Sequence, residues 1–242
     1  MSITRSKCWI CGDDEPNSRE HKIKKSDLKY LYPEATQTKP IFHRINGIRK
    51  RAIGSLNASA LKYPKSICAA CNGSLTQPYD HAWTKLSGFL HTHSQEIEKN
   101  NSLDIASVFQ TDLQENIKNI QLYFAKQFGC KLIESEIDFD LSEIRNAILA
   151  STEVPSLYLK LRRSDNGKSA TYGAVSNVEV SKPANGELEY IHFFYTVGTF
   201  SIDILYCTDP NEFVLRDYFL PCTVRKQLSI GRADYSQKYD AN

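Results

Sequence analysis

Four cysteines stand in two closely spaced pairs, and this spacing is typical of a metal site. The pairs are Cys8-x-x-Cys11 and Cys68-x-x-Cys71. Each CxxC turn can offer two thiolates to one ion, and four thiolates in a tetrahedron are a common donor set for structural zinc. The chain holds 7 cysteines, and an odd number disfavours a framework made only of disulfides. We therefore predict a four-cysteine zinc site and expect the other three cysteines to be small buried side chains.

An acid and a histidine, Glu20 and His21, lie in the segment between the two cysteine pairs, and Asn72 directly follows the last cysteine. Zinc would bring the ends of segment 12–67 together, and so can place these three residues in one small space. Carboxylate and amide oxygens suit Mg²⁺ or Mn²⁺, and an imidazole accepts a proton near neutral pH. A hard cation and a histidine base are suited to hydrolysis of a phosphodiester.

Each of these residues also has a plainer interpretation. Glu20 can form an ion pair with Lys24, four residues on. Asn72 can be a helix N-cap, and His21 can be a surface histidine in a charged loop. A second acid-histidine pair, Asp80-His81, supports a rival alignment in which His81 is the metal ligand nine residues after Asn72. We prefer the first alignment because Asn72 adjoins the last cysteine, and this makes Asp80 a helix cap or the partner of a ligand.

The positive charge of the chain is concentrated in its front part. Residues 1–93 carry 15 Lys and Arg against 7 Asp and Glu, a net of +8, whereas residues 94–242 carry 15 against 21, a net of −6. A basic front part indicates a polyanion as partner, and a solvated lysine face is the alternative. The residues that we expect to contact phosphate groups are Lys22, Lys24, Lys25, Arg44, Arg49, Lys50 and Arg51.

The order "CWICG … SREH … ICAACN" resembles the HNH, or ββα-metal, endonucleases, and within them the branch with CxxC, an acid-histidine pair and CxxC-Asn. This resemblance implies that the acid-histidine pair lies on the first strand of a β-hairpin and that Asn72 opens the helix packed across it. It implies His21 as the general base that activates water. It further implies Glu20 and Asn72 as ligands of a catalytic Mg²⁺ or Mn²⁺, with the cysteines holding a structural zinc.

The resemblance covers about residues 7–90, and the chain departs from the family pattern in two places. Many members carry a middle asparagine some nine residues before the second metal ligand, where this chain has Tyr63, with Asn57 as a weak substitute. The acid-histidine pair is also separated from the second CxxC by nearly 50 residues. We interpret the insertion, which carries "FHRINGIRKR" from Phe42 to Arg51, as a longer hairpin or loop that contacts phosphate.

The remaining sequence changes from helical to strand patterns. Apolar residues recur at helical spacing within 102–132, and "FDLSEIRNAILAS" is a further short helix. After Pro155, runs of β-branched and aromatic residues are separated by turn signals at 165–167, 185–186 and Gly198. We predict an α+β protein with a zinc-stapled HNH-like domain at 1–93, a helical segment at 94–155 and an antiparallel β-rich region of unknown role at 156–242.

The predicted function is a metal-dependent endonuclease that hydrolyses phosphodiester bonds in nucleic acid, DNA being the expected substrate, with a possible place in defence or mobile-element biology. The alternative is a non-catalytic zinc-ribbon module that binds nucleic acid or protein. The sequence has no apolar run of signal-peptide or membrane-spanning length, so we expect a cytoplasmic protein with no membrane partner. A protein partner or a homodimer would use the helical or β-rich part.

Overall fold

The computed structural model describes residues 6–45, 49–164, 172–182, 188–210, 218 and 227–233. The predicted turns at 165–167 and 185–186, and Cys222, lie outside these ranges. The helices are α1 (Lys25–Leu31), η1 (Ser59–Leu61), η2 (Cys71–Leu75), α2 (Gln77–Thr92), α3 (Ser94–Asn100), α4 (Ile105–Val108), α5 (Leu113–Glu134) and α6 (Ser142–Ala150). The strands are β1 (Ile41–Ile45), β2 (Arg49–Ile53), β3 (Ser102–Asp104), β4 (Leu157–Ser164), β5 (Gly173–Val175), β6 (Glu179–Ser181), β7 (Tyr190–Val197), β8 (Phe200–Tyr206), β9 (Gln227–Ser229) and β10 (Gly231–Ala233).

Six of these strands form one sheet in the order β10-β4-β8-β7-β5, with β6 also paired to β7. Strands β4, β8, β7, β5 and β6 pair antiparallel, and β10 pairs parallel to β4. The mixed α+β character and the antiparallel pairing agree with the prediction. Gly198 lies at positive φ in the tight turn between β7 and β8, where the sequence predicted a turn.

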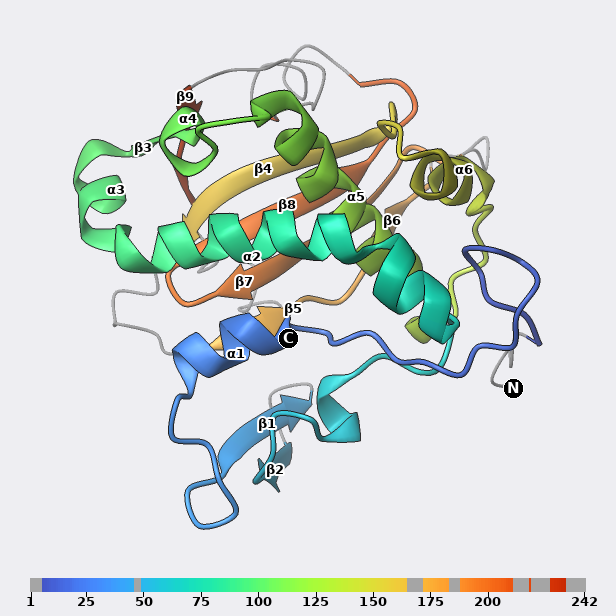
Figure 1. Cartoon of the computed structure of the whole chain (residues 1–242), viewed down its shortest axis with the longest axis horizontal. Coiled ribbons are helices and arrows are strands. Elements are labelled where there is room, and N and C mark those ends of the chain that lie inside the picture. Colours follow the sequence, from blue (N-terminus) through green and yellow to red (C-terminus); the bar gives the residue numbers. More distant parts are fainter. Residues whose placement is uncertain are drawn as a thin grey trace.

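Successive side chains along each strand point to opposite faces of the sheet, so the two faces carry different hydrophobic clusters. On β4, Leu159 and Leu161 join the main hydrophobic core, whereas Tyr158 belongs to a second cluster with Leu205 and Cys207. Helices α2, α5 and α6 cover the core face (Figure 1). Residues from all three predicted parts of the chain, from Cys8 to Ile230, contribute to this one core.

Helix α5 is buried around its whole circumference from Asn119 to Leu132. The sequence predicted a single apolar stripe, but α5 lies between the sheet and α2, so both of its sides are covered (Figure 1). Polar side chains at Gln121, Lys126 and Gln127 are therefore buried together with the apolar ones. Buried polar groups of this kind require partners, and these partners define the candidate site below.

The front of the chain is fixed to this helical layer by close contacts. Trp9, which lies within the first CxxC, packs on Gly129 of α5, where a Cβ atom would stand 2.4 Å from the indole ring. Gly12 has a φ of +81° directly after the same turn, and the Arg145 guanidinium of α6 donates to the Cys11 carbonyl oxygen at 2.7 Å. Glycine is required at both places, by close approach at 129 and by backbone conformation at 12.

The front segment has a hairpin, but in a different place from the one that the resemblance implies. Strands β1 and β2 lie in the insertion and pair from Ile41–Ile53 to Ile45–Arg49, which agrees with the predicted longer hairpin or loop. The acid-histidine segment is not a regular strand, although isolated antiparallel bridges join Ser18 to Ile67 and His21 to Lys62. A ββα-metal fold thus stays a prediction. Among the described residues, no helix is long and apolar enough to cross a bilayer.

Asp27 lies in the core, and this gives a prediction on the pH dependence of stability. Its Oδ2 accepts hydrogen bonds from Trp83 Nε1 at 2.9 Å and from the Tyr195 hydroxyl at 2.8 Å. Burial nevertheless raises the pKa of Asp27 above its ordinary value of 3.8. A raised pKa means that the folded chain holds a proton that the unfolded chain releases, so this carboxyl lowers stability as pH rises above about 4.

We expect Asp27→Asn to gain stability relative to the wild type as pH rises from about 4 to about 7. The measurement is urea unfolding of both proteins across this range. Asp140→Asn is the control, because hydrogen bonds from Ser142 lower the pKa of Asp140 below 3.8. The stability that its carboxylate contributes is gained below about pH 4, so the difference between this variant and the wild type should change little across the range. Wild-type and Asp27→Asn curves that run parallel would show that Asp27 does not titrate differently on folding.

Candidate functional site

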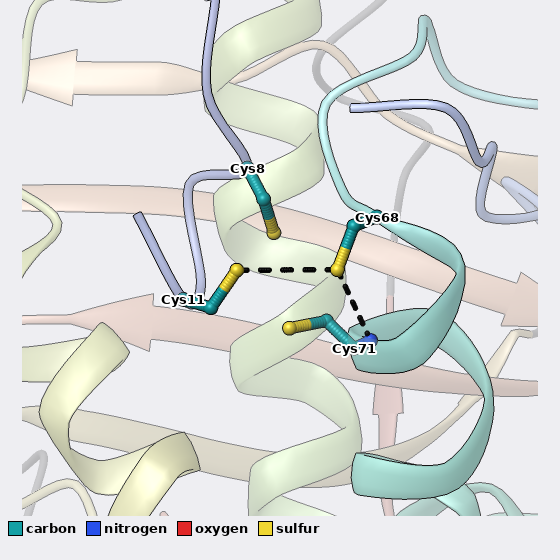
Figure 2. A group of neighbouring side chains, drawn as sticks. All are labelled: Cys8, Cys11, Cys68 and Cys71. Carbon is teal, nitrogen blue, oxygen red and sulfur yellow. Dashed lines mark hydrogen bonds between the residues drawn. The ribbon is translucent and has the colours of Figure 1, made fainter. Parts of the chain in front are cut away.

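The four cysteines of the two CxxC pairs converge on one point. Their Sγ atoms all lie within 4.8 Å of one another, and Cys11 Sγ is 3.9 Å from Cys68 Sγ (Figure 2). Four thiolates about 2.3 Å from a central zinc would stand roughly 3.8 Å apart. The donor set fits zinc in chemistry and in spacing, so the predicted group can hold a metal such as zinc.

Local hydrogen bonds shape each cysteine pair into a tight turn. The Gly12 N–H donates to the Cys8 carbonyl oxygen at 2.8 Å, and the Asn72 N–H donates to the Cys68 carbonyl oxygen at 3.0 Å. The Cys71 N–H also points to Cys68 Sγ at 3.4 Å. Cys8, Cys68 and Cys71 are buried, and the partly buried Cys11 packs against the core. The other described cysteines, Cys130 and Cys207, are buried, as predicted.

The acid-histidine segment runs antiparallel to the segment that leads into the second CxxC. The Ser18 N–H donates to the Ile67 carbonyl oxygen, and the Tyr63 N–H donates to the Glu20 carbonyl oxygen, both at 2.9 Å. Asn72, in η2, reaches back across this ladder. Its Nδ2 donates to Ser18 Oγ at 2.9 Å, and its buried Oδ1 has no hydrogen-bond partner in the described part of the chain. The structure thus brings Asn72 to the residues directly before Glu20.

His21 is held by one ring nitrogen. Its Nε2 lies 3.2 Å from the Leu56 carbonyl oxygen, and because a carbonyl can only accept, Nε2 carries the proton. The neutral ring then presents the Nδ1 lone pair, and no described residue hydrogen bonds to this atom. Burial lowers the pKa of His21 below 6.5, and the nearby Lys62 ammonium acts in the same direction. His21 is therefore neutral near pH 7 and able to accept a proton at Nδ1.

Glu20 points the other way, into the helical layer. Its Oε2 forms an ion pair with Lys126 Nζ of α5 at 2.7 Å, and its Oε1 accepts the His21 N–H at 2.9 Å. Lys126 is fully buried and also contacts Asp80 Oδ2 at 3.1 Å and Thr76 Oγ1 at 3.3 Å. These carboxylates raise the pKa of Lys126 despite its burial, so the ammonium stays charged.

This ammonium decides how well a divalent metal fits Glu20. Both oxygens of Glu20 already accept from protein donors, and an ion at Oε2 would have to replace Lys126. Of the two implied ligands, Glu20 and Asn72, only Asn72 has a side-chain oxygen, Oδ1, without a hydrogen-bond partner among the described groups. As held here, the pair does not fit the Mg²⁺ or Mn²⁺ site that the resemblance implies. Among the described residues, the four cysteines are the only group of three or more His, Cys, Asp or Glu that could share an ion.

The remaining predicted residues lie around this centre in different states. Asp80 forms ion pairs with Lys24, at 2.7 Å, and with Lys126, while His81 is exposed on α2. Lys22 forms an ion pair with Glu134, so neither Lys22 nor Lys24 is a free cation. Lys25 is half-buried and Arg51 is exposed. The other three predicted phosphate contacts belong to the β1–β2 hairpin, and the structure describes only their backbone: Arg44, Arg49 and Lys50.

Two residues of α5 were missed by sequence reasoning. Lys126 fixes Glu20, and Gln127 Nε2 donates to the His21 carbonyl oxygen at 3.2 Å. The available signal was a Lys-Gln pair inside the apolar run "LYFAKQFGC", because a charged residue in a buried helix needs a partner.

Comparisons with models of protein families, with curated proteins and with solved structures found no match.

Proposed function

We propose that this protein is an HNH-type nuclease that hydrolyses phosphodiester bonds in nucleic acid, with DNA as the expected substrate. The observation that carries the proposal is the state of His21. Its Nε2–H is anchored on Leu56, its Nδ1 is open, and it lies on a segment braced by the ladder to the four-cysteine centre. A fixed, neutral imidazole with one free nitrogen is what a general base requires.

In this mechanism, His21 Nδ1 takes a proton from a water molecule. The oxygen of that water attacks phosphorus, the bond from phosphorus to the leaving oxygen breaks, and the leaving oxygen acquires a proton from solvent. The backbone contact with Leu56 stabilises the imidazolium that forms, because the Nε2–H bond strengthens when the ring becomes charged. Lys62 and Lys25 are close enough to His21 to act on its pKa, and their positive potential favours an approaching phosphate.

The four cysteines would hold zinc and supply rigidity, outside the chemical step. The resemblance also implies a catalytic Mg²⁺ or Mn²⁺, but Glu20 as held by Lys126 does not fit that role. No step is therefore assigned to a second metal, and the response to added metal is part of the test. The fixed ammonium beside Glu20 also favours the second candidate function, a zinc-ribbon module that binds nucleic acid without cleaving it.

The decisive measurement is plasmid nicking by the wild type, His21→Ala and His81→Ala, each with Mg²⁺, Mn²⁺ or no added metal. We expect His21→Ala to lose activity by a factor of about 10²–10⁴, which is the usual contribution of a general base. His81→Ala is the matched control, because His81 is an exposed histidine of the rival alignment, and it should cleave as the wild type does.

Each protein must first show the wild-type melting temperature and the wild-type zinc content. Equal nicking by the wild type and His21→Ala would exclude His21 as the base. If His81→Ala alone lost activity, the rival alignment would be correct. Salt-sensitive DNA binding with no cleavage under any metal condition would support the zinc-ribbon function in place of the nuclease.

A further inference from the structure

A groove of about 960 Å³ lies beside the acid-histidine segment. One wall is the hairpin strand β1, and the opposite wall is α1, the residues after it and the start of β5. Its floor includes the C-terminal end of α5 and Lys22, the residue that follows His21. A volume of this order is typical of a site for a small ligand or for one unit of a polymer.

The groove carries an excess of positive charge. Lys22 Nζ lies 2.5 Å from Glu134 Oε1, and Lys131 Nζ lies 3.1 Å from Glu134 Oε2. Two ammonium groups share one carboxylate, so one positive charge remains uncompensated within this triad. Arg51 does not line the groove, but it is exposed and stands opposite His43 of the groove wall in the hairpin register, so it adds positive potential beside the groove. An anion of phosphate type complements this arrangement.

The groove also offers an aromatic side chain at its rim and an open hydrogen-bond position. The two come from successive residues of β1, whose side chains point to opposite faces of the strand. Phe42 is 64% exposed, more than any other large apolar side chain in the described part of the chain. Its neighbour His43 has a buried Nδ1 without a partner among the described groups. Burial, and after it the Lys22 ammonium, lower the pKa of His43, so this ring is neutral near pH 7. Tyr32 and Tyr172 line the other wall.

We propose that this groove binds a nucleotide unit, with the base stacked on Phe42 and the phosphate near Lys22 and Lys131. Aromatic faces combined with cations are the usual means by which proteins hold single-stranded nucleic acid. The ligand is either one unit of the nucleic-acid strand that His21 would cleave or a free nucleotide. In the first case the inference rests on the proposed function and assigns the path of the substrate, because Lys22 and His21 are adjacent on one segment.

The test measures binding of a fluorescein-labelled single-stranded oligodeoxynucleotide by anisotropy, without added Mg²⁺ or Mn²⁺. Calorimetry with deoxyadenosine monophosphate forms the second arm. We expect Phe42→Ala to weaken oligonucleotide binding about 10-fold and Lys22→Gln to flatten its salt dependence by about one phosphate contact. Leu149→Ala is the matched control, because Leu149 is an exposed apolar residue of α6, outside the groove, and it should bind as the wild type does.

A loss confined to the oligonucleotide arm identifies the substrate strand as the ligand, and a loss in the monophosphate arm identifies a free nucleotide. Oligonucleotide and monophosphate binding that both survive Phe42→Ala unchanged would overturn the proposal. Binding is measured without cleavage, so the two proposals can fail separately. If the protein binds through Phe42 but never nicks DNA, the binding proposal stands and the nuclease proposal is wrong. If the protein nicks DNA and Phe42→Ala binds with unchanged affinity, the nuclease proposal stands and the binding proposal is wrong.

Discussion

Removal of the metal from the four-cysteine centre is expected to unfold the front of the protein. Apparent binding free energies of structural zinc are about 10–16 kcal/mol in small domains, and this binding energy is folding energy. Here the centre closes the segment between Cys11 and Cys68, and the residues beside the cysteines, Trp9, Ile10 and Ile67, are all buried in the core. Loss of the metal would therefore release apolar surface as well as the ladder that carries His21.

The measurement is the zinc content of the purified protein, followed by thermal melts with and without a strong chelator. We expect one zinc per chain and a fall in melting temperature of more than about 10 °C on chelation, which corresponds to a loss of several kcal/mol in a chain of this size. Cys71→Ser should reproduce this loss.

The matched control is Cys207→Ala, which removes a buried cysteine of the second cluster, far from the metal donors in sequence. This change should cost only about 1 kcal/mol and leave the zinc content unchanged. A wild-type protein that contains no metal and melts at the same temperature with chelator would contradict the zinc assignment and leave the four thiols as a plain buried cluster.

The second large effect is expected at Lys126. Its ammonium is fully buried and holds the carboxylates of Glu20 and Asp80. Lys126→Met keeps the apolar stem but leaves these carboxylates without their shared cation. Removal of one partner from a buried ion pair typically costs about 3–5 kcal/mol, because the remaining charge is uncompensated. We expect the melting temperature to fall by about 10 °C.

Urea unfolding of Lys126→Met, Glu20→Gln and the double variant separates this cost from lost packing. The double variant should be more stable than the sum of the single effects predicts, since removal of both charges leaves less uncompensated charge. Lys118→Met is the control in the same helix, where the ion pair with Glu115 is near the surface, and it should cost at most about 1 kcal/mol. Strictly additive effects would show that Lys126 does not act through Glu20.

Sequence reasoning was most successful where the chemistry is local. A CxxC turn is set by four consecutive residues, so two such turns predict a shared metal centre from their spacing alone, and the four Sγ atoms do converge. The strand pattern after Pro155 was read correctly for the same reason, because runs of β-branched and aromatic residues separated by turn residues are local signals. Strand β8 is buried along its whole length, since hydrophobic clusters lie on both faces of the sheet. The hairpin in the insertion also agrees with its prediction.

The state of Glu20 depended on a residue more than a hundred positions away. The sequence placed Glu20 beside His21 and suggested either a metal ligand or a partner for Lys24. In the fold, Lys24 forms an ion pair with Asp80, and Lys126 forms an ion pair with Glu20. No local sequence pattern predicts which cation pairs with Glu20. The pairing follows from the packing of α5 between the sheet and α2, because this packing buries Lys126 and a buried ammonium requires carboxylate partners. The sequence by itself determined which groups could do chemistry, and only the tertiary structure decided which of them are free to do it, because burial and pairing are properties of the whole packed core.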